Sequence, residues 1–247
     1  MKIERYHINT QGNDDDAYSE AIKFACKLVE NGMDADTIIL LARTKRNIGW
    51  LERIFDTQTV KQLFNGMKFK NCDAKFLIQT AKTYTRYSAN KDIVISMALG
   101  YDELMKIDDY NGIKAIVSIP WLKDDIERWI KTWKSKEIRT NEYSEIYELP
   151  EPIVQTAMKE LTSVINTSTG ITHPSDNNRA KTFVRALYKY STIEGNKTMA
   201  YLIRELDWKS DDASDMKKLI DTLNNGKYFQ GGDKTYLKNH IKRWNEK

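Results

Sequence analysis

The stretch Thr37-Ile38-Ile39-Leu40-Leu41-Ala42 is apolar at every position after its threonine. A strand with one solvated face alternates apolar and polar residues, whereas a strand covered on both faces of a parallel sheet is apolar throughout. The runs 92–99 (DIVISMAL) and 114–119 (KAIVSI) are of the same kind. These three runs therefore predict buried strands of a parallel sheet.

Helical patterns separate the buried runs. Residues 14–31 carry apolar side chains at helical spacing and are followed by Gly32, a typical helix end. The other predicted elements are a strand at 2–9, a helix from about residue 48 that includes Trp50, and helices at 101–107 and 122–133. The β-rich pieces 75–80 and 82–87 predict a strand pair or a hairpin insertion. Strands alternating with helices imply right-handed crossovers and a parallel sheet.

The β signal disappears after residue 136. Residues 137–152 are polar, contain Pro150 and Pro152, and predict a linker. Helical periodicity then returns at 153–165, 177–190, 198–206, 211–223 and 234–244. The predicted fold class is α/β: a mainly parallel, Rossmann-like sheet domain (1–136), the linker (137–152) and an all-α helical domain (153–247) with a basic C-terminal helix.

Composition narrows the class of protein. No apolar run approaches the roughly 20 residues that cross a bilayer, so no membrane partner is expected. The first residues lack the apolar stretch of a secretory signal. Two cysteines are too few for a disulfide framework, which favours reduced thiols and a cytoplasmic location. The net charge of +4 comes from the second half, since residues 151–247 hold 16 Lys and Arg against 12 Asp and Glu.

Candidate ligand-binding residues follow the predicted strands. Ligands of open parallel sheets bind beyond the carboxyl ends of the strands. The four junctions are 9–16 (NTQGNDDD), 42–47 (ARTKRN), 98–103 (ALGYDE) and 119–122 (IPWL). Their candidate residues are Thr10, Asp14, Thr44, Lys45, Arg46, Asn47, Gly100 and Trp121.

Of the four junctions, 42–47 gives the strongest indication of a ligand site. Cations crowd the start of a predicted helix, where the helix dipole disfavours them by some tenths of a kcal/mol each. Backbone N–H groups, the polar side chains of Thr44 and Asn47, and the charges of Lys45 and Arg46 together would form a site for phosphate or nucleic acid. An ordinary solvated helix cap is the alternative.

The other junctions are weaker signals. The acids Asp14–Asp16 suit a helix dipole, or they supply a general base or metal ligands. Gly100 allows a backbone to approach a ligand, or simply makes a tight turn. Trp121 stacks on a base or ring, or plugs the space between helix and sheet.

Several familiar sites are excluded. The chain has no G-x-G-x-x-G, no G-x-x-x-x-G-K-[ST] and no G-x-S-x-G. His7, His173 and His240 are far apart and no cysteine pair has zinc spacing, so no metal site is predicted. No motif identifies a cofactor or catalytic residues.

The helical domain offers a second place for nucleic acid. Lys234, Lys238 and Lys242 are spaced i, i+4 and i+8 on the predicted last helix, with Arg243 beside them. Such a cationic row either contacts phosphates or is an ordinary solvated face. The pair 198–206 and 211–223 has helix-turn-helix spacing, but acids at the start of its second helix argue against reading a DNA groove.

These patterns lead to one hypothesis and two alternatives. We expect an intracellular binding protein for a phosphate-bearing ligand, a nucleotide or nucleic acid, at the carboxyl edge of the α/β sheet. The alternatives are a hydrolase or transferase that uses rim carboxylates, and a non-enzymatic assembly protein with an oligomeric or protein partner. Whether the protein is an enzyme is left open by the sequence.

Overall fold

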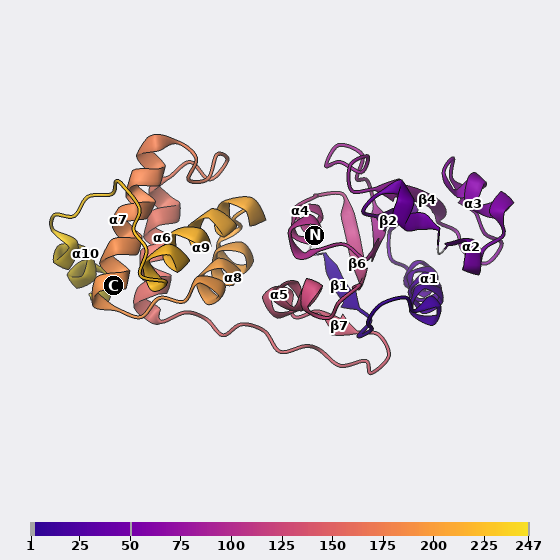
Figure 1. Cartoon of the computed structure of the whole chain (residues 1–247), viewed down its shortest axis with the longest axis horizontal. Helices are drawn as coiled ribbons and strands as arrows, with labels where there is room; N and C mark the ends of the chain where they lie inside the picture. The colour runs from indigo at the N-terminus through magenta and orange to yellow at the C-terminus, as the bar shows by residue number, and fades with distance from the viewer. Residues whose placement is uncertain (1–2, 50, 247) are drawn as a thin grey trace. The chain divides into compact units, whose positions relative to one another are not determined.

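The computed structural model describes residues 3–49 and 51–246, except for the side chain of Asn47 (Figure 1). The predicted strand residue Lys2 and the predicted helix residue Trp50 lie outside the described residues. The chain divides into two compact units, Met1–Ile146 and Tyr147–Lys247.

The first unit contains a mostly parallel sheet of seven strands in the order β3-β4-β2-β5-β6-β1-β7. The strands are β1 Glu4–His7, β2 Thr37–Ala42, β3 Met67–Lys68, β4 Lys75–Thr80, β5 Asp92–Met97, β6 Ile113–Ile119 and β7 Lys136–Glu137. Only the β3–β4 pairing is antiparallel among them. The predicted buried strands are confirmed: β5 is buried at every position, and β2 and β6 at nearly every one.

Helices cover both faces of this sheet. They are α1 Asp15–Glu30, the 3-10 helix η1 Lys45–Ile48, α2 Leu51–Ile54, α3 Thr57–Leu63, α4 Tyr101–Asp108 and α5 Asp124–Trp133. Helix α1 packs against β5 and β6 and contacts α2, while α4 packs against α5. Figure 1 shows α1, α2 and α3 on one side of the sheet and α4 and α5 on the other.

The strand order creates a switch point between β2 and β5. The chain leaves β2 for β4 on one side, whereas it leaves β5 for β6 on the other. Right-handed connections that step in opposite directions place their helices on opposite faces. The loops that follow β2 and β5 therefore diverge and leave a crevice at the carboxyl edge.

Two predicted elements are wrong. Residues 82–87 form turns instead of a strand, and 75–80 is β4, which pairs in parallel with β2 and antiparallel with the short β3 that precedes it. The side chain of Thr83 accepts a hydrogen bond from Thr80 N at 3.0 Å, so hydroxyls replace the strand ladder here. The helix from about residue 48 is reduced to η1 and α2, and α3 was not predicted.

Three groups of polar side chains are buried and hydrogen-bonded in the first unit. Asp108 accepts hydrogen bonds from Arg5 Nε at 3.0 Å and from Trp129 Nε1 at 2.6 Å. Tyr84 donates to Asp92 Oδ2 at 2.8 Å. The hydroxyl of Ser96 on β5 donates to that of Ser118 on β6 at 3.0 Å. Each buried polar atom named here thus has a partner, as stability requires.

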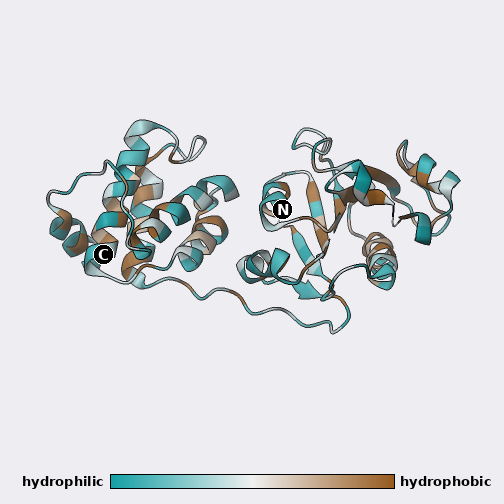
Figure 2. Cartoon of the chain, in the orientation of Figure 1, coloured by the Kyte–Doolittle hydropathy of each residue, from teal (hydrophilic) through white to brown (hydrophobic). Residues whose placement is uncertain are grey.

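The second unit is helical, as predicted. It consists of α6 Pro152–Val164, α7 Pro174–Tyr190, α8 Gly195–Leu206, α9 Ser210–Asn224 and α10 Leu237–Asn245. Helices α6 and α7 contact each other and both contact α10, and the pairs α8–α9, α7–α9 and α6–α8 also pack together. In Figure 2, brown apolar residues lie on the strands and the inner sides of helices, and teal polar residues cover the outer turns. None of the described helices combines the length and apolarity needed to cross a bilayer.

Candidate functional site

A cavity of about 330 Å³ lies at the switch point, and we call it the switch-point cavity. Residues that follow two neighbouring strands line it: Arg43 and Thr44 after β2, and Ala81 and Lys82 after β4. Helix α4, which follows β5, contributes Glu103, Lys106 and Ile107, and Tyr110 completes the lining. Three cations face one acid, so the cavity favours a negatively charged ligand.

The guanidinium of Arg43 is oriented by helix α4. Its Nε donates to Glu103 Oε1 at 2.8 Å, and the other carboxylate oxygen of Glu103 accepts a hydrogen bond from Gly100 N at 3.0 Å. Both oxygens of Glu103 are therefore used for structure. The pair holds Arg43 at the edge of the cavity although its side chain is 61% exposed.

A second cavity, of about 280 Å³, adjoins the first through Arg43 and Glu103. It lies between the N-terminal ends of α4 and α5. Arg128 lies over the ring of Tyr101 at 3.8 Å, and the remaining lining residues are Gly100, Asp102, Asp124 and Asp125. Acids outnumber cations here. Of these two cavities, only the switch-point cavity has an excess of cations.

The structure separates the residues of the predicted junction 42–47. Thr44 lines the switch-point cavity, whereas Lys45 and Arg46 are exposed on η1 and belong to neither cavity lining. Since η1 is a four-residue 3-10 helix, it supplies little of the expected helix dipole. The side chain of Asn47 is outside the described residues.

Thr10 and Asp14 are occupied by capping contacts. The Thr10 hydroxyl donates to Asp14 Oδ2 at 2.6 Å, and Asp14 Oδ1 accepts from Ala17 N at 2.9 Å as the N-cap of α1. Arg139 also donates to Asp14 Oδ2, at 3.3 Å. Neither Thr10 nor Asp14 lines either edge cavity.

Trp121 lies at the rim of the sheet with 48% of its surface exposed, so it is not a buried plug. Its carbonyl accepts a hydrogen bond from Gly12 N at 2.7 Å, which ties the loops after β6 and β1 together. Gly100, by contrast, lies in the cavity between α4 and α5. Strand order explains the separation: β1 is three strand spacings, about 14 Å, from β2.

Two of the rim carboxylates, those of Asp14 and Asp15, are held in their charged form. The hydrogen bond from Thr10 is the main cause that lowers the pKa of Asp14, and the hydrogen bond from Arg53 is the main cause that lowers the pKa of Asp15. A general acid near neutral pH needs a raised pKa. Among the described residues, no group of three or more His, Cys, Asp or Glu side chains is arranged to hold a metal ion.

Three cations of the switch-point cavity were not among the predicted site residues. Arg43 belongs to the predicted junction but was not selected from it. Lys82 follows β4, which the sequence did not identify as a parallel strand. Lys106 is three residues after Glu103 on α4, one helical turn further along the same side. Treating 75–80 as a fifth strand end would have revealed Lys82.

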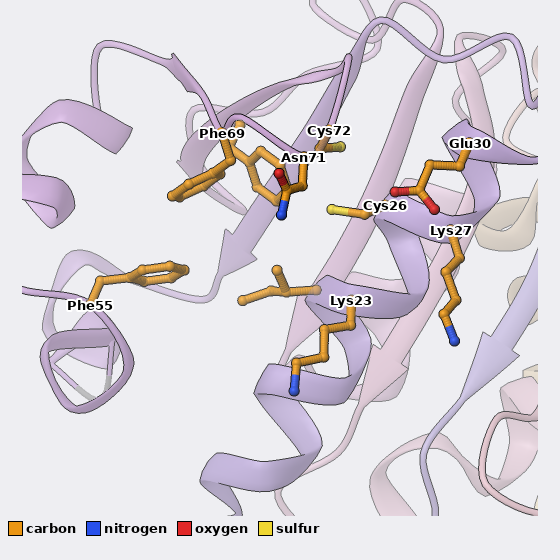
Figure 3. Close-up of a pocket in the computed structure, with 10 residues that line it drawn as sticks. Lys23, Cys26, Lys27, Glu30, Phe55, Phe69, Asn71 and Cys72 are labelled. Atoms are coloured by element: carbon orange, nitrogen blue, oxygen red, sulfur yellow. The ribbon is translucent and has the colours of Figure 1, made fainter.

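An apolar cavity of about 400 Å³ lies elsewhere in this unit, where α1 approaches the segment before β4 (Figure 3). It is lined by Ile22, Lys23, Cys26, Lys27, Glu30, Phe55, Phe69, Asn71, Cys72 and Phe76. Both cysteines are free and interact by a hydrogen bond. Burial raises the pKa of Cys26 to about 12, so its thiol is protonated and weakly nucleophilic at neutral pH.

The predicted lysine row of the second unit is not formed as one helical stripe. Helix α10 begins at Leu237, because Tyr236 adopts a left-handed conformation and Lys234 belongs to the preceding loop. Lys238 and Lys242 are exposed on α10. Arg243 donates to Glu160 Oε2 at 3.1 Å and thereby joins α10 to α6.

Comparison with known proteins gives one result. Residues 150–245 match the family described as "Domain of unknown function (DUF1889)", which corresponds to most of the helical unit. No curated protein and no solved structure matches the chain.

Proposed function

We propose that the α/β unit binds a phosphate-bearing ligand, a nucleotide or a nucleic-acid phosphate, in the switch-point cavity. The observation that carries this proposal is the convergence of Arg43, Lys82 and Lys106 on one cavity at the carboxyl edge. Guanidinium and ammonium groups are the side chains that proteins use for phosphate. A volume of about 330 Å³ is within the range of small-molecule sites.

The predicted residues Lys45 and Arg46 have a secondary role in this proposal. They follow Thr44 directly along the chain and are exposed. A ligand with several phosphates extends beyond the cavity toward them, whereas a monophosphate does not. The length of the phosphate chain therefore determines how much these two cations contribute.

The decisive experiment is calorimetric titration of nucleoside mono- and triphosphates into the wild type and into Arg43→Glu/Lys106→Glu. Each charge-assisted hydrogen bond to a ligand contributes about 1.5–3 kcal/mol, so the double reversal should weaken binding at least about tenfold. Lys45→Glu/Arg46→Glu should weaken triphosphate binding more than monophosphate binding.

Lys61→Glu/Lys68→Glu is the matched control. Both lysines are exposed and neither lines the cavity, so the same change in net charge should leave the affinity nearly unchanged. Equal losses in the control and in Arg43→Glu/Lys106→Glu would show that only net charge matters. Binding of neither nucleotide to the wild type would also refute the proposal.

Two further expectations belong to the same proposal. A Rossmann-like assignment is supported by the open parallel sheet, by the helices on both of its faces and by the switch point. The strand order, β3-β4-β2-β5-β6-β1-β7, is nevertheless particular to this chain. Two free cysteines support a cytoplasmic location, where thiols stay reduced. The pairing of Asp14 and Asp15 with cations gives no support to catalysis by these carboxylates.

A further inference from the structure

The loop between α9 and α10, residues 225–236, is fastened to helix α7. Gly232 N donates to Asn178 Oδ1 at 2.8 Å, and Asp233 N donates to Thr182 Oγ1 at 2.7 Å. A Cβ atom at Gly232 would lie 2.9 Å from Lys181 Cβ, and Gly232 has φ +76°. Glycine is therefore required for this close approach, and the loop is held in one conformation.

Arg185 of α7 organises the aromatic residues of this loop. Its Nε and Nη2 donate to the carbonyl oxygens of Gly231 and Phe229 at 3.1 and 2.6 Å. The same guanidinium lies over the rings of Tyr228 and Phe229 at 5.0 and 4.5 Å. Backbone and aromatic contacts together fix where these rings point.

Tyr228 is presented to solvent by these contacts. It is 61% exposed, and Lys234 Nζ lies 5.1 Å from its ring and donates to its hydroxyl at 2.8 Å. Lys181 Nζ lies 5.9 Å from the ring of Phe229. Lys181, Arg185 and the 47%-exposed Tyr188 are spaced i, i+4 and i+7, so they lie on one side of α7.

We propose that these residues form a binding surface for single-stranded nucleic acid. The cation–tyrosine surface comprises Lys181, Arg185, Tyr188, Tyr228, Phe229 and Lys234. Bases stack on exposed aromatic rings with little sequence preference, while neighbouring cations contact the phosphates. Tyr228 provides the stacking ring, and Lys181 and Lys234 contact the backbone. This surface is independent of the proposed nucleotide site in the α/β unit.

The chemistry of the surface favours nucleic acid over a membrane. The exposed large hydrophobic residues described between 174 and 246 are all tyrosines: Tyr188, Tyr190, Tyr228 and Tyr236. A membrane-binding loop would expose aliphatic side chains or tryptophan for insertion. The one acid of the loop, Asp233, accepts hydrogen bonds from the backbone and hydroxyl of Thr235 at 2.7 Å each.

The test is a fluorescence-anisotropy titration of the full chain with a labelled oligothymidine of about 20 nucleotides, longer than one such site covers. Tyr228→Ala should weaken binding by roughly 5- to 150-fold, the loss expected for one stacked base. Tyr228→Phe retains the stacking ring and should stay within about threefold of the wild type. Circular dichroism confirms that each variant is folded.

Tyr143→Ala is the matched control. Tyr143 of the first unit is 62% exposed, and the Nζ atoms of Lys134 and Lys136 lie 5.4 and 5.6 Å from its ring. Its removal should leave binding unchanged. Equal losses in Tyr143→Ala and Tyr228→Ala would overturn the proposal, because they would indicate diffuse attraction to cationic tyrosines.

A salt series provides a readout that does not depend on Tyr228. Each phosphate contact adds about 0.7 to the slope of log affinity against log salt for single strands. Lys234→Gln should reduce the slope by about this amount, whereas Lys218→Gln, which removes an exposed lysine paired with Asp215 on α9, should not.

Three further outcomes would overturn the proposal. They are the absence of oligothymidine binding, equal affinity for inorganic polyphosphate of similar charge, and tighter binding to phosphatidylglycerol vesicles than to the oligonucleotide. Tyr228→Ala should weaken oligothymidine binding by the same factor in the wild type and in the Arg43→Glu/Lys106→Glu background, because the two proposed sites lie in different units. The two proposed sites can therefore fail or succeed separately.

Discussion

At the amino edge of the sheet, Asp92 is buried against Tyr84, and Asp108 at the end of α4 is buried against Arg5 and Trp129. At the carboxyl edge, Arg43, Lys82 and Lys106 are exposed around a cavity. Buried charges must be paired because desolvation is costly, so the first group is committed to the fold. Exposed charges around a cavity can change partners, so the second group is available to a ligand.

The largest expected effect comes from breaking the buried ion pair. Asp108→Ala leaves Arg5 with 7% side-chain exposure and without its carboxylate, which should cost about 3–5 kcal/mol of unfolding free energy. Urea unfolding measures this loss. A loss of unfolding free energy smaller than that expected for an exposed ion pair would show that the buried charges at the amino edge do not stabilise the fold.

A pH series should reveal the buried carboxylate of Asp92. Burial raises its pKa to about 6, so folding favours the protonated form. The resulting stabilisation is complete below about pH 4, the usual aspartate range, and is lost as pH rises through 6. The unfolding free energy of Asp92→Asn should therefore be about 1–3 kcal/mol higher than that of the wild type at pH 7.5, and the two should be equal near pH 4. A difference independent of pH would contradict this.

The buried hydroxyl pair tests whether burial, and not the edge itself, decides the role of a polar group. Ser96 and Ser118 are near the carboxyl ends of β5 and β6 but are each 1% exposed. Ser118→Ala should cost about 1–2 kcal/mol because Ser96 loses its acceptor. The double variant with Ser96→Ala should recover part of this loss. Additive losses in the double-mutant cycle would count against a direct pair.

The smallest effect on stability is expected at the switch point. The Arg43–Glu103 pair has side-chain exposures of 61% and 28%, so Arg43→Ala should change the unfolding free energy by less than about 1 kcal/mol. Nucleotide affinity of the same variant should nevertheless fall. A large destabilisation would show that Arg43 stabilises the fold and is not available to a ligand.

The switch-point cavity shows where the local sequence pattern was insufficient to predict the site. Residues 75–80 alternate in exposure because β4 is a strand near the sheet edge, and this weaker pattern hid its parallel pairing and with it Lys82. The predicted Thr10 and Trp121 were placed with Thr44 only because strand order was unknown. In the helical unit, periodicity predicted α10 three residues too early, since the Asp233–Thr235 contacts hold Lys234 in a loop.

The sequence by itself determined the buried parallel strands, the alternation with helices and the change to an all-helical second half. These features depend on the order of apolar and polar residues along the chain, which local periodicity records. Only the tertiary structure decided that β2 lies beside β5, and hence that Arg43, Lys82 and Lys106 meet. The physical reason is that strand pairing is a contact between distant segments, so the composition of either segment does not specify its neighbour.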